Sequence, residues 1–249
     1  VDTIIVGQAC GTRALAAVGS TGNLTSLIVN FYVGLSTGAS VVIAQYYGAQ
    51  NDKRIHQAVH TSYILAIVSG ILMMLFGLFF SYQCLDAIGT PHDILNDATL
   101  YMQLYFLCMI PGAIYNIGAG ILRAVGDSKR PLYYLIVCSI VNVVFDFIFV
   151  VIFHQGIAGA AIATVIAQFV CAILVTIQLM RTKEVYKLAL SQMKFHLPVL
   201  KKIIMIGAPA GIQSTMYSIS NIVLQSHINA FGTQTIASWS VYVKIDALF

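Results

Sequence analysis

Residues 131–153 read PLYYLIVCSIVNVVFDFIFVVIF, an apolar run whose single charged side chain is Asp146. A helix needs about 20 apolar residues to cross the hydrocarbon core of a bilayer. The stretch therefore predicts a membrane-spanning helix, and this helix places one carboxyl group inside the membrane.

The composition of the whole chain supports the same conclusion. Of its 249 residues, 59% are hydrophobic and 9% are charged, whereas soluble domains carry about 25% charged residues. This excludes an ordinary soluble enzyme, a disordered chain and a nucleic-acid-binding protein, and it indicates an integral membrane protein. The sequence has no HExxH, GxSxG or Walker motif, so we expect neither an enzyme nor a resident cofactor.

Charge-free intervals and turn residues divide the chain into spans. They predict helices near residues 20–44, 57–80, 98–122, 131–153, 158–180 and 203–230, with partial spans at 1–6 and from 235 onward. The fold class is therefore an all-α, multi-pass bundle of membrane helices. Both ends of the chain lie within apolar runs, and for this reason we expect an internal piece of a longer protein.

Basic residues are concentrated in alternate loops. All but two of the 13 lie there, namely Lys53, Arg54, Arg123, Lys129, Arg130, Arg181, Lys183, Lys187, Lys194, Lys201 and Lys202. Basic loops face the cytoplasm in most membrane proteins. This predicts that these loops are cytoplasmic, and that the N-terminus of the full protein is cytoplasmic as well.

A weak internal repeat suggests two halves. Two short turns, 221 positions apart, share four residues. The first turn contains Ala9, Gly11, Thr12 and Ala16, and the equivalent positions of the second are Ala230, Gly232, Thr233 and Ala237. Six spans separate the two turns, so the halves would be parallel repeats. We predict a first lobe over residues 1–180, a linker over 181–202 and the start of a second lobe over 203–249. The basic linker either lies along an anionic inner leaflet or is an ordinary cytoplasmic loop.

Two acids fall in predicted spans, Asp2 and Asp146. An acid inside the membrane is costly and is a functional candidate by default. Asn142 lies one turn before Asp146 on the same helix face, and Thr164 lies among the small residues of the next span. The oxygens of Asp2, Asn142, Asp146 and Thr164 are suitable ligands for Na⁺, or proton acceptors. Hydrogen bonding that only holds the helices together is the alternative.

Further polar residues in the spans are weaker candidates for a functional site. Asn23, Asn30, Asn116 and Gln168 are possible cavity-lining residues, with packing between helices as the alternative. The 13 tyrosines fit an aromatic belt at the membrane interface.

Several stretches recur in one known family. They are VDTIIVG at 1–7, ALAAVG at 14–19, AQYYGA at 44–49, LRAVGDSKRP at 122–131, IGAPAGIQ at 206–213 and KIDAL at 244–248. Together they resemble the multidrug and toxic compound extrusion (MATE) transporters, and the resemblance covers the chain in order. It implies a twelve-helix protein of two six-helix lobes, of which this chain covers the end of the first helix to the start of the eighth.

The resemblance also implies a function and a site. MATE proteins export amphipathic, often cationic organic compounds in exchange for inward Na⁺ or H⁺, here across a bacterial plasma membrane, and we expect a monomer. Asp2, Asn142, Asp146 and Thr164 match the positions of the cation site in the first lobe of several members. Gln213 stands where some members carry a glutamate, so we place the coupling in the first lobe and keep Gln213 as a possible cavity residue.

Two other classes of function stay open at this level. A lipid-linked saccharide flippase of the same broader superfamily would need a basic cavity for its pyrophosphate substrate, and the spans contain almost no Lys or Arg. A membrane scaffold or receptor would give Asp2 and Asp146 no role, and their mutation would be silent.

Overall fold

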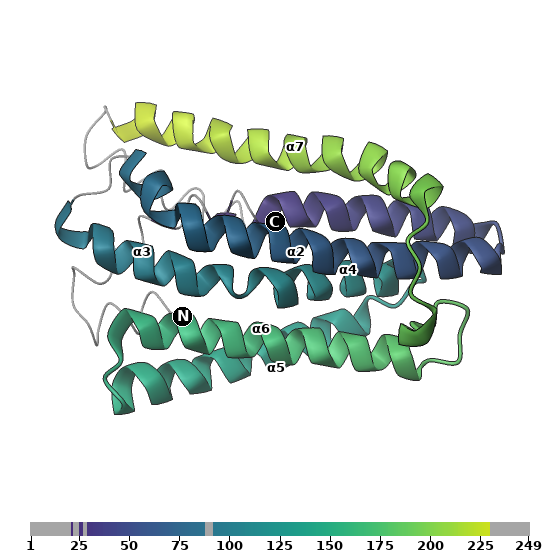
Figure 1. The fold of residues 1–249 in the computed structure, drawn as a ribbon, viewed down its shortest axis with the longest axis horizontal. Helices are drawn as coiled ribbons and strands as arrows, with labels where there is room; N and C mark the ends of the chain where they lie inside the picture. The colour runs from purple at the N-terminus through teal and green to yellow at the C-terminus, as the bar shows by residue number, and fades with distance from the viewer. Residues whose placement is uncertain (1–20, 22–24, 27–28, 88–91, 230–249) are drawn as a thin grey trace.

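Long helices run side by side through the computed structural model, which describes residues 21, 25–26, 29–87 and 92–229 (Figure 1). Residues 29–48 are helical. They are followed by α2 (Asp52–Ala87), α3 (His92–Phe106), α4 (Met109–Ala124), α5 (Lys129–Asp146), the π-helical turn η1 (Phe147–Ile152), α6 (Gly156–Arg181), the 3-10 turn η2 (Leu190–Gln192) and α7 (Leu197–Asn229). Over these residues the chain forms no strand.

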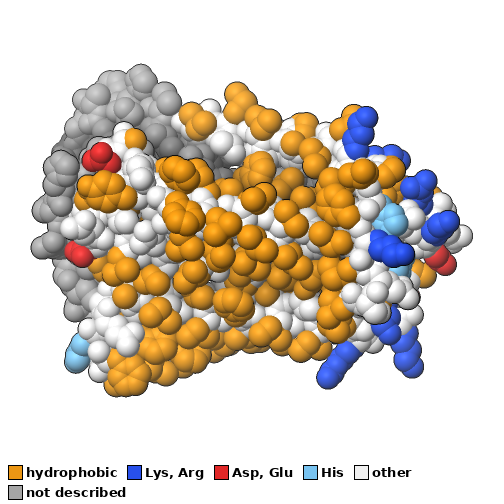
Figure 2. Space-filling view, in the orientation of Figure 1, with side chains coloured by type: hydrophobic (Ala, Val, Ile, Leu, Met, Phe, Trp, Pro, Cys, Tyr) orange, Lys and Arg blue, Asp and Glu red, His pale blue; other side chains and the backbone are white. Residues whose placement is uncertain are grey.

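Several of the described helices have the length and composition of membrane spans. Three are long and apolar enough to cross a bilayer, namely α2, α5 continued by η1, and α6, and the bent pair of α3 and α4 supplies a fourth. Large apolar side chains cover the outside of the bundle, such as Leu72 (62% exposed) and Phe79 (71% exposed). Figure 2 shows them as a broad hydrophobic band, with lysine and arginine side chains gathered at one end. We call this end the basic end.

The predicted span over 98–122 is bent. The chain there forms two helices, α3 and α4, which meet at an angle of 45°. The break lies at Leu107 and Cys108, four and three residues before Pro111. Proline has no amide hydrogen and its ring clashes with the carbonyl four residues earlier, so Pro111 explains the bend.

Helix α2 is longer than its predicted span of 57–80. Its 36 residues extend over about 54 Å at 1.5 Å per residue, whereas the hydrocarbon core is about 30 Å thick. The first turns of α2 therefore project at the basic end, where the helix carries Lys53 and Arg54.

Close contacts between helices hold the bundle together. The hydroxyl groups of Tyr63 on α2 and Thr176 on α6 are hydrogen bonded at 2.6 Å. A Cβ atom added at Gly118 would lie 2.7 Å from the side chain of Val175, which shows how tightly α4 packs on α6. Hydrogen bonds and small residues are the usual means by which membrane helices associate, since lipid offers no hydrophobic driving force between them.

The predicted linker folds back onto the basic end. Helix α6 extends to Arg181 and α7 already begins at Leu197, so the non-helical part is shorter than residues 181–202. Leu188 is buried, and its amide donates to the carbonyl of Leu179 at 2.8 Å. These contacts place the segment against the end of α6.

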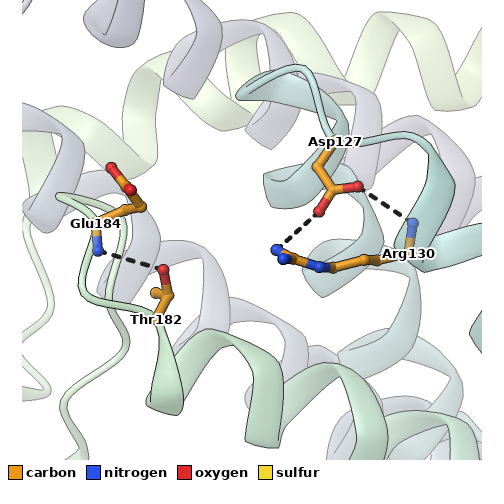
Figure 3. Close-up of polar contacts among 4 residues, drawn as sticks. All are labelled: Asp127, Arg130, Thr182 and Glu184. Carbon is orange, nitrogen blue, oxygen red and sulfur yellow. Dashed lines mark hydrogen bonds and ion pairs between the residues drawn. The ribbon is translucent and has the colours of Figure 1, made fainter.

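Two local motifs shape the loops at this end (Figure 3). Arg130 forms an ion pair with Asp127 at 3.1 Å, and its amide donates to a carboxylate oxygen of Asp127 at 3.2 Å. At the start of the linker, the amide of Glu184 donates to the hydroxyl of Thr182 at 3.2 Å. Side-chain oxygens thus satisfy backbone amides at the start of α5 and after the end of α6, as such residues commonly do at helix ends and turns.

Candidate cation and substrate site

The structure joins two of the predicted cation-site residues across helices α5 and α6. The side-chain amide of Asn142 donates to the hydroxyl of Thr164 at 3.4 Å. Thr164 in turn donates to the carbonyl of Ala160 one turn earlier, at 3.1 Å. Both side chains are half-buried, and their contact supports the predicted meeting of these two polar faces.

Asp146 lies one turn after Asn142 and is fully buried. It is the last residue of α5, directly before the π-helical turn η1. Short π-helical insertions are rare and often occur at functional sites. A buried carboxyl group requires a proton, a cation or hydrogen bonds to compensate its charge. This position is therefore suited to a carboxyl group that exchanges one such partner for another.

A cavity of about 180 Å³ lies at the bend between α3 and α4. Its polar lining includes Asn116 and Gln168, two of the predicted cavity residues, together with Tyr32, Tyr105 and Tyr115. The described lining contains no charged side chain. Aromatic faces and amides recognise organic cations without fixing one geometry, so this lining is chemically suited to a broad range of ligands.

Hydrogen bonds fix Asn116 in the cavity wall. Its side-chain amide donates to the backbone carbonyl of Gly112 at 2.8 Å, and the backbone carbonyl of Asn116 accepts from the hydroxyl of Ser36 at 2.6 Å. The second bond ties α4 to the helix of residues 29–48.

Two tyrosines of the wall are anchored in the same manner. Tyr32 donates its hydroxyl to the carbonyl of Ser69 at 2.8 Å, and Tyr115 donates to the carbonyl of Pro131 at 3.1 Å. Each bond connects neighbouring helices. The cavity wall is therefore built before any ligand enters.

The remaining predicted site residues have mixed positions. Asp2 and Asn23 lie outside the described residues. Asn30 is half-buried on the helix of residues 29–48, next to Val29 of the cavity wall. Gln213 is exposed on α7 and does not line this cavity.

The tyrosines of this cavity were not predicted as site residues, because tyrosines in membrane proteins commonly form an interfacial belt. Tyr32 lies in the middle of the predicted span 20–44. That position was the available signal, because belt residues lie at the ends of spans.

Comparisons with known proteins agree with this architecture. A family model described as MatE matches residues 1–148. The probable multidrug resistance protein YoeA of Bacillus subtilis is 29% identical over 261 residues, which covers 100% of this chain and 56% of that protein. The probable multidrug resistance protein NorM of Thermotoga maritima is 22% identical and matches 99% of this chain and 54% of that protein.

Solved structures match as well. A crystal structure of MATE in the bent conformation is 26% identical, with a TM-score of 0.91 over 99% of this chain and 55% of that one. An inward-facing multidrug resistance MATE family transporter is also 26% identical, with a TM-score of 0.84 over 99% of this chain and 57% of that one. These matches confirm the predicted helical membrane fold. The chain spans about half the length of the relatives it matches.

Proposed function

Because this chain belongs to the MATE family of membrane transporters, we propose that it forms the first lobe and the beginning of the second lobe of a secondary antiporter. The complete transporter exports amphipathic, often cationic organic compounds and takes up Na⁺ or H⁺ in exchange. Relatives named as probable multidrug resistance proteins support the substrate class.

One observation carries the proposal: the fully buried Asp146, one turn from the hydrogen-bonded pair of Asn142 and Thr164. The negative charge of a carboxylate in the membrane needs a compensating partner in every state of the transport cycle. Na⁺ bound by the oxygens of these three residues, or a proton on Asp146, supplies it during ion entry. Release of that ion on the other side of the membrane then changes the charge of the lobe, and this couples ion flow to substrate export.

The cavity at the bend of α3 and α4 is the proposed substrate contact of this lobe. Tyr32, Tyr105 and Tyr115 offer aromatic faces to a cationic or planar compound. Its volume of about 180 Å³ is below the roughly 300–1,000 Å³ of drug-sized pockets. We therefore propose that the second lobe completes the binding site.

The charge distribution supports an orientation. Lysine and arginine side chains gather at the basic end (Figure 2), and such residues favour the cytoplasmic face of a membrane. We propose that the basic end faces the cytoplasm, in a cell membrane.

A lipid-linked saccharide flippase is not favoured. Its pyrophosphate substrate calls for Lys or Arg side chains in the cavity, and the cavity lining in the described part of the chain contains neither.

Dye efflux from vesicles containing the complete transporter tests the proposal, with Na⁺ and H⁺ gradients imposed separately. Asp146→Asn removes the charge of the buried acid, and Asp86→Asn makes the same change at an exposed position of α2. We expect one gradient to drive efflux in the wild type, a loss of at least tenfold in Asp146→Asn, and wild-type efflux in Asp86→Asn. Unchanged efflux in Asp146→Asn, or no gradient-driven efflux by the wild type, would contradict antiport through this site.

A further inference from the structure

A second pocket, of about 570 Å³, opens at the basic end. It lies between the first turns of α2 and the chain around η2. Its lining includes Lys53, His56, Gln57, Gln192, Lys194 and His196. The transport site described above uses none of these residues.

The lining of this pocket suits an anion. Lys53 and Lys194 carry positive charges, while His56 and His196 offer ring N–H groups. Burial and the neighbouring His60 lower the pKa of His56, so the two lysines supply the positive charge. No acidic side chain lines the pocket. Phosphate groups bind such clusters of basic and hydrogen-bonding side chains.

The walls of the pocket are fixed by a buried histidine, His60, which is 1% exposed. The backbone amide of Ala189 donates to Nε2 of His60 at 3.1 Å. The carbonyl of Ala189 lies at the same distance from Nε2, and Nδ1 donates to the carbonyl of His56 at 2.7 Å. The ring of His60 also lies against that of His56, with centroids 4.0 Å apart.

A second bond holds the other wall. The amide of His196 donates to the hydroxyl of Thr61 at 3.2 Å. The segment before α7 is thus attached to α2 at two points, one on either side of η2. A pocket built in this way needs little reorganisation when it binds a ligand.

Exposed apolar side chains flank the pocket on the same segment. Leu190 is 52% exposed, Phe195 is 45% exposed and Leu197 is 68% exposed, and they alternate with the polar lining residues. Figure 2 shows histidine and basic side chains beside hydrophobic ones at this end. A soluble anion gives these apolar residues no partner, whereas a phospholipid offers acyl chains next to its phosphate.

We propose that this pocket binds the phosphate headgroup of an anionic phospholipid, with the acyl chains lying along Leu190, Phe195 and Leu197. Basic pockets at the cytoplasmic side of membrane proteins are typical sites for such headgroups. The bound lipid would attach the segment between α6 and α7 to the membrane surface. This inference goes beyond the proposed transport function and does not depend on it.

Native mass spectrometry of the complete transporter in detergent tests the proposal, with phosphatidylglycerol and phosphatidylcholine as the added lipids. The test variant is the double substitution Lys53→Gln and Lys194→Gln. The matched control is Lys183→Gln and Lys187→Gln, which removes two exposed charges from the same end but outside the pocket. Detergent removes the charged membrane surface, so the measurement reports lipid binding in the pocket and not the general attraction of basic residues to an anionic membrane.

We expect the wild type to bind phosphatidylglycerol at least tenfold more tightly than phosphatidylcholine. An exposed ion pair contributes up to about fivefold in affinity, so the pocket variant should bind about 5- to 25-fold more weakly, and the control less than twofold. Equal losses in both double variants, or no preference for phosphatidylglycerol, would overturn the proposal. Displacement of the lipid by millimolar inorganic phosphate would also overturn it, in favour of a soluble anion.

A third measurement excludes misfolding as the reason for lost binding. The thermal unfolding of both double variants is recorded in detergent without lipid and then with phosphatidylglycerol. A bound ligand stabilises the folded state by mass action. We expect equal midpoints without lipid, and a rise on lipid addition in the wild type and the control that the pocket variant lacks. A rise of the same size in the pocket variant would contradict the site.

Discussion

Substitution of Gly38 by alanine is expected to force apart the helix of residues 29–48 and α7. The two helices meet through small residues, and an added Cβ at Gly38 would lie 2.5 Å from the carbonyl oxygen of Ile203 and 2.6 Å from the backbone of Gly207. These neighbours are backbone atoms, so no side-chain rotation relieves the overlap. The contact joins the first predicted lobe to the start of the second.

The structure sets the size of this effect. Ordinary Cβ contacts begin at 3.4 Å, so the helices must separate locally by about 0.9 Å, and overpacking of this kind costs about 1–3 kcal/mol. Alanine is favoured over glycine within a helix by about 0.5–1 kcal/mol, which offsets part of the cost. We expect Gly38→Ala to lower the free energy of unfolding by about 1–2 kcal/mol.

Two other glycines supply graded controls. An added Cβ at Gly211 would have its nearest contact at 3.4 Å, and one at Gly48 would have no neighbour within 4 Å. Both alanine variants should therefore be unchanged or more stable by about 0.5 kcal/mol. Reversible unfolding in mixed micelles measures all three variants. If Gly38→Ala were as stable as Gly48→Ala, the close contact of the two helices would be refuted.

Two other contacts give sharp expectations. Tyr63→Phe removes the hydrogen bond to Thr176 between α2 and α6 and should lower the free energy of unfolding by about 0.6 kcal/mol, at most about 1.7. A double-mutant cycle with Thr176→Val measures this coupling by the same unfolding assay. Additive effects of the two substitutions would contradict the hydrogen bond. His60→Ala removes the ring nitrogen that contacts the amide and the carbonyl of Ala189 and should speed hydrogen exchange of that half-buried amide by about 2- to 13-fold, since a typical hydrogen bond contributes about 0.5–1.5 kcal/mol. Mass-spectrometric exchange measures this, and unchanged protection of the segment would show that His60 does not hold it.

The sequence predicted the features that depend on local pattern. Apolar length identified α2, α5 and α6 as spans, and basic residues identified the basic end. The one-turn spacing of Asn142 and Asp146, with Thr164 among small residues of the next helix, predicted the meeting of α5 and α6 that the bond between Asn142 and Thr164 confirms.

Features that depend on distant pairs could not be predicted in this way. His60 and Ala189 are 129 positions apart, and no periodicity in either segment indicates that they meet. The cavity at the bend of α3 and α4 also depends on residues distant in sequence, because Tyr32 and Gln168 approach each other only after four helices have packed. Apolar periodicity identifies helices, whereas their mutual rotation decides which side chains share a cavity.

Movement of the coupling ion in response to substrate is the direct test of coupling through Asp146. The complete transporter is placed in vesicles with an ion-sensitive dye inside, and a substrate gradient is imposed without any ion gradient. We expect substrate flow to drive Na⁺ or H⁺ in the opposite direction, and Asp146→Asn to abolish this counter-movement. Substrate flow without movement of either ion, or the same ion movement in Asp146→Asn, would contradict coupling through the buried acid.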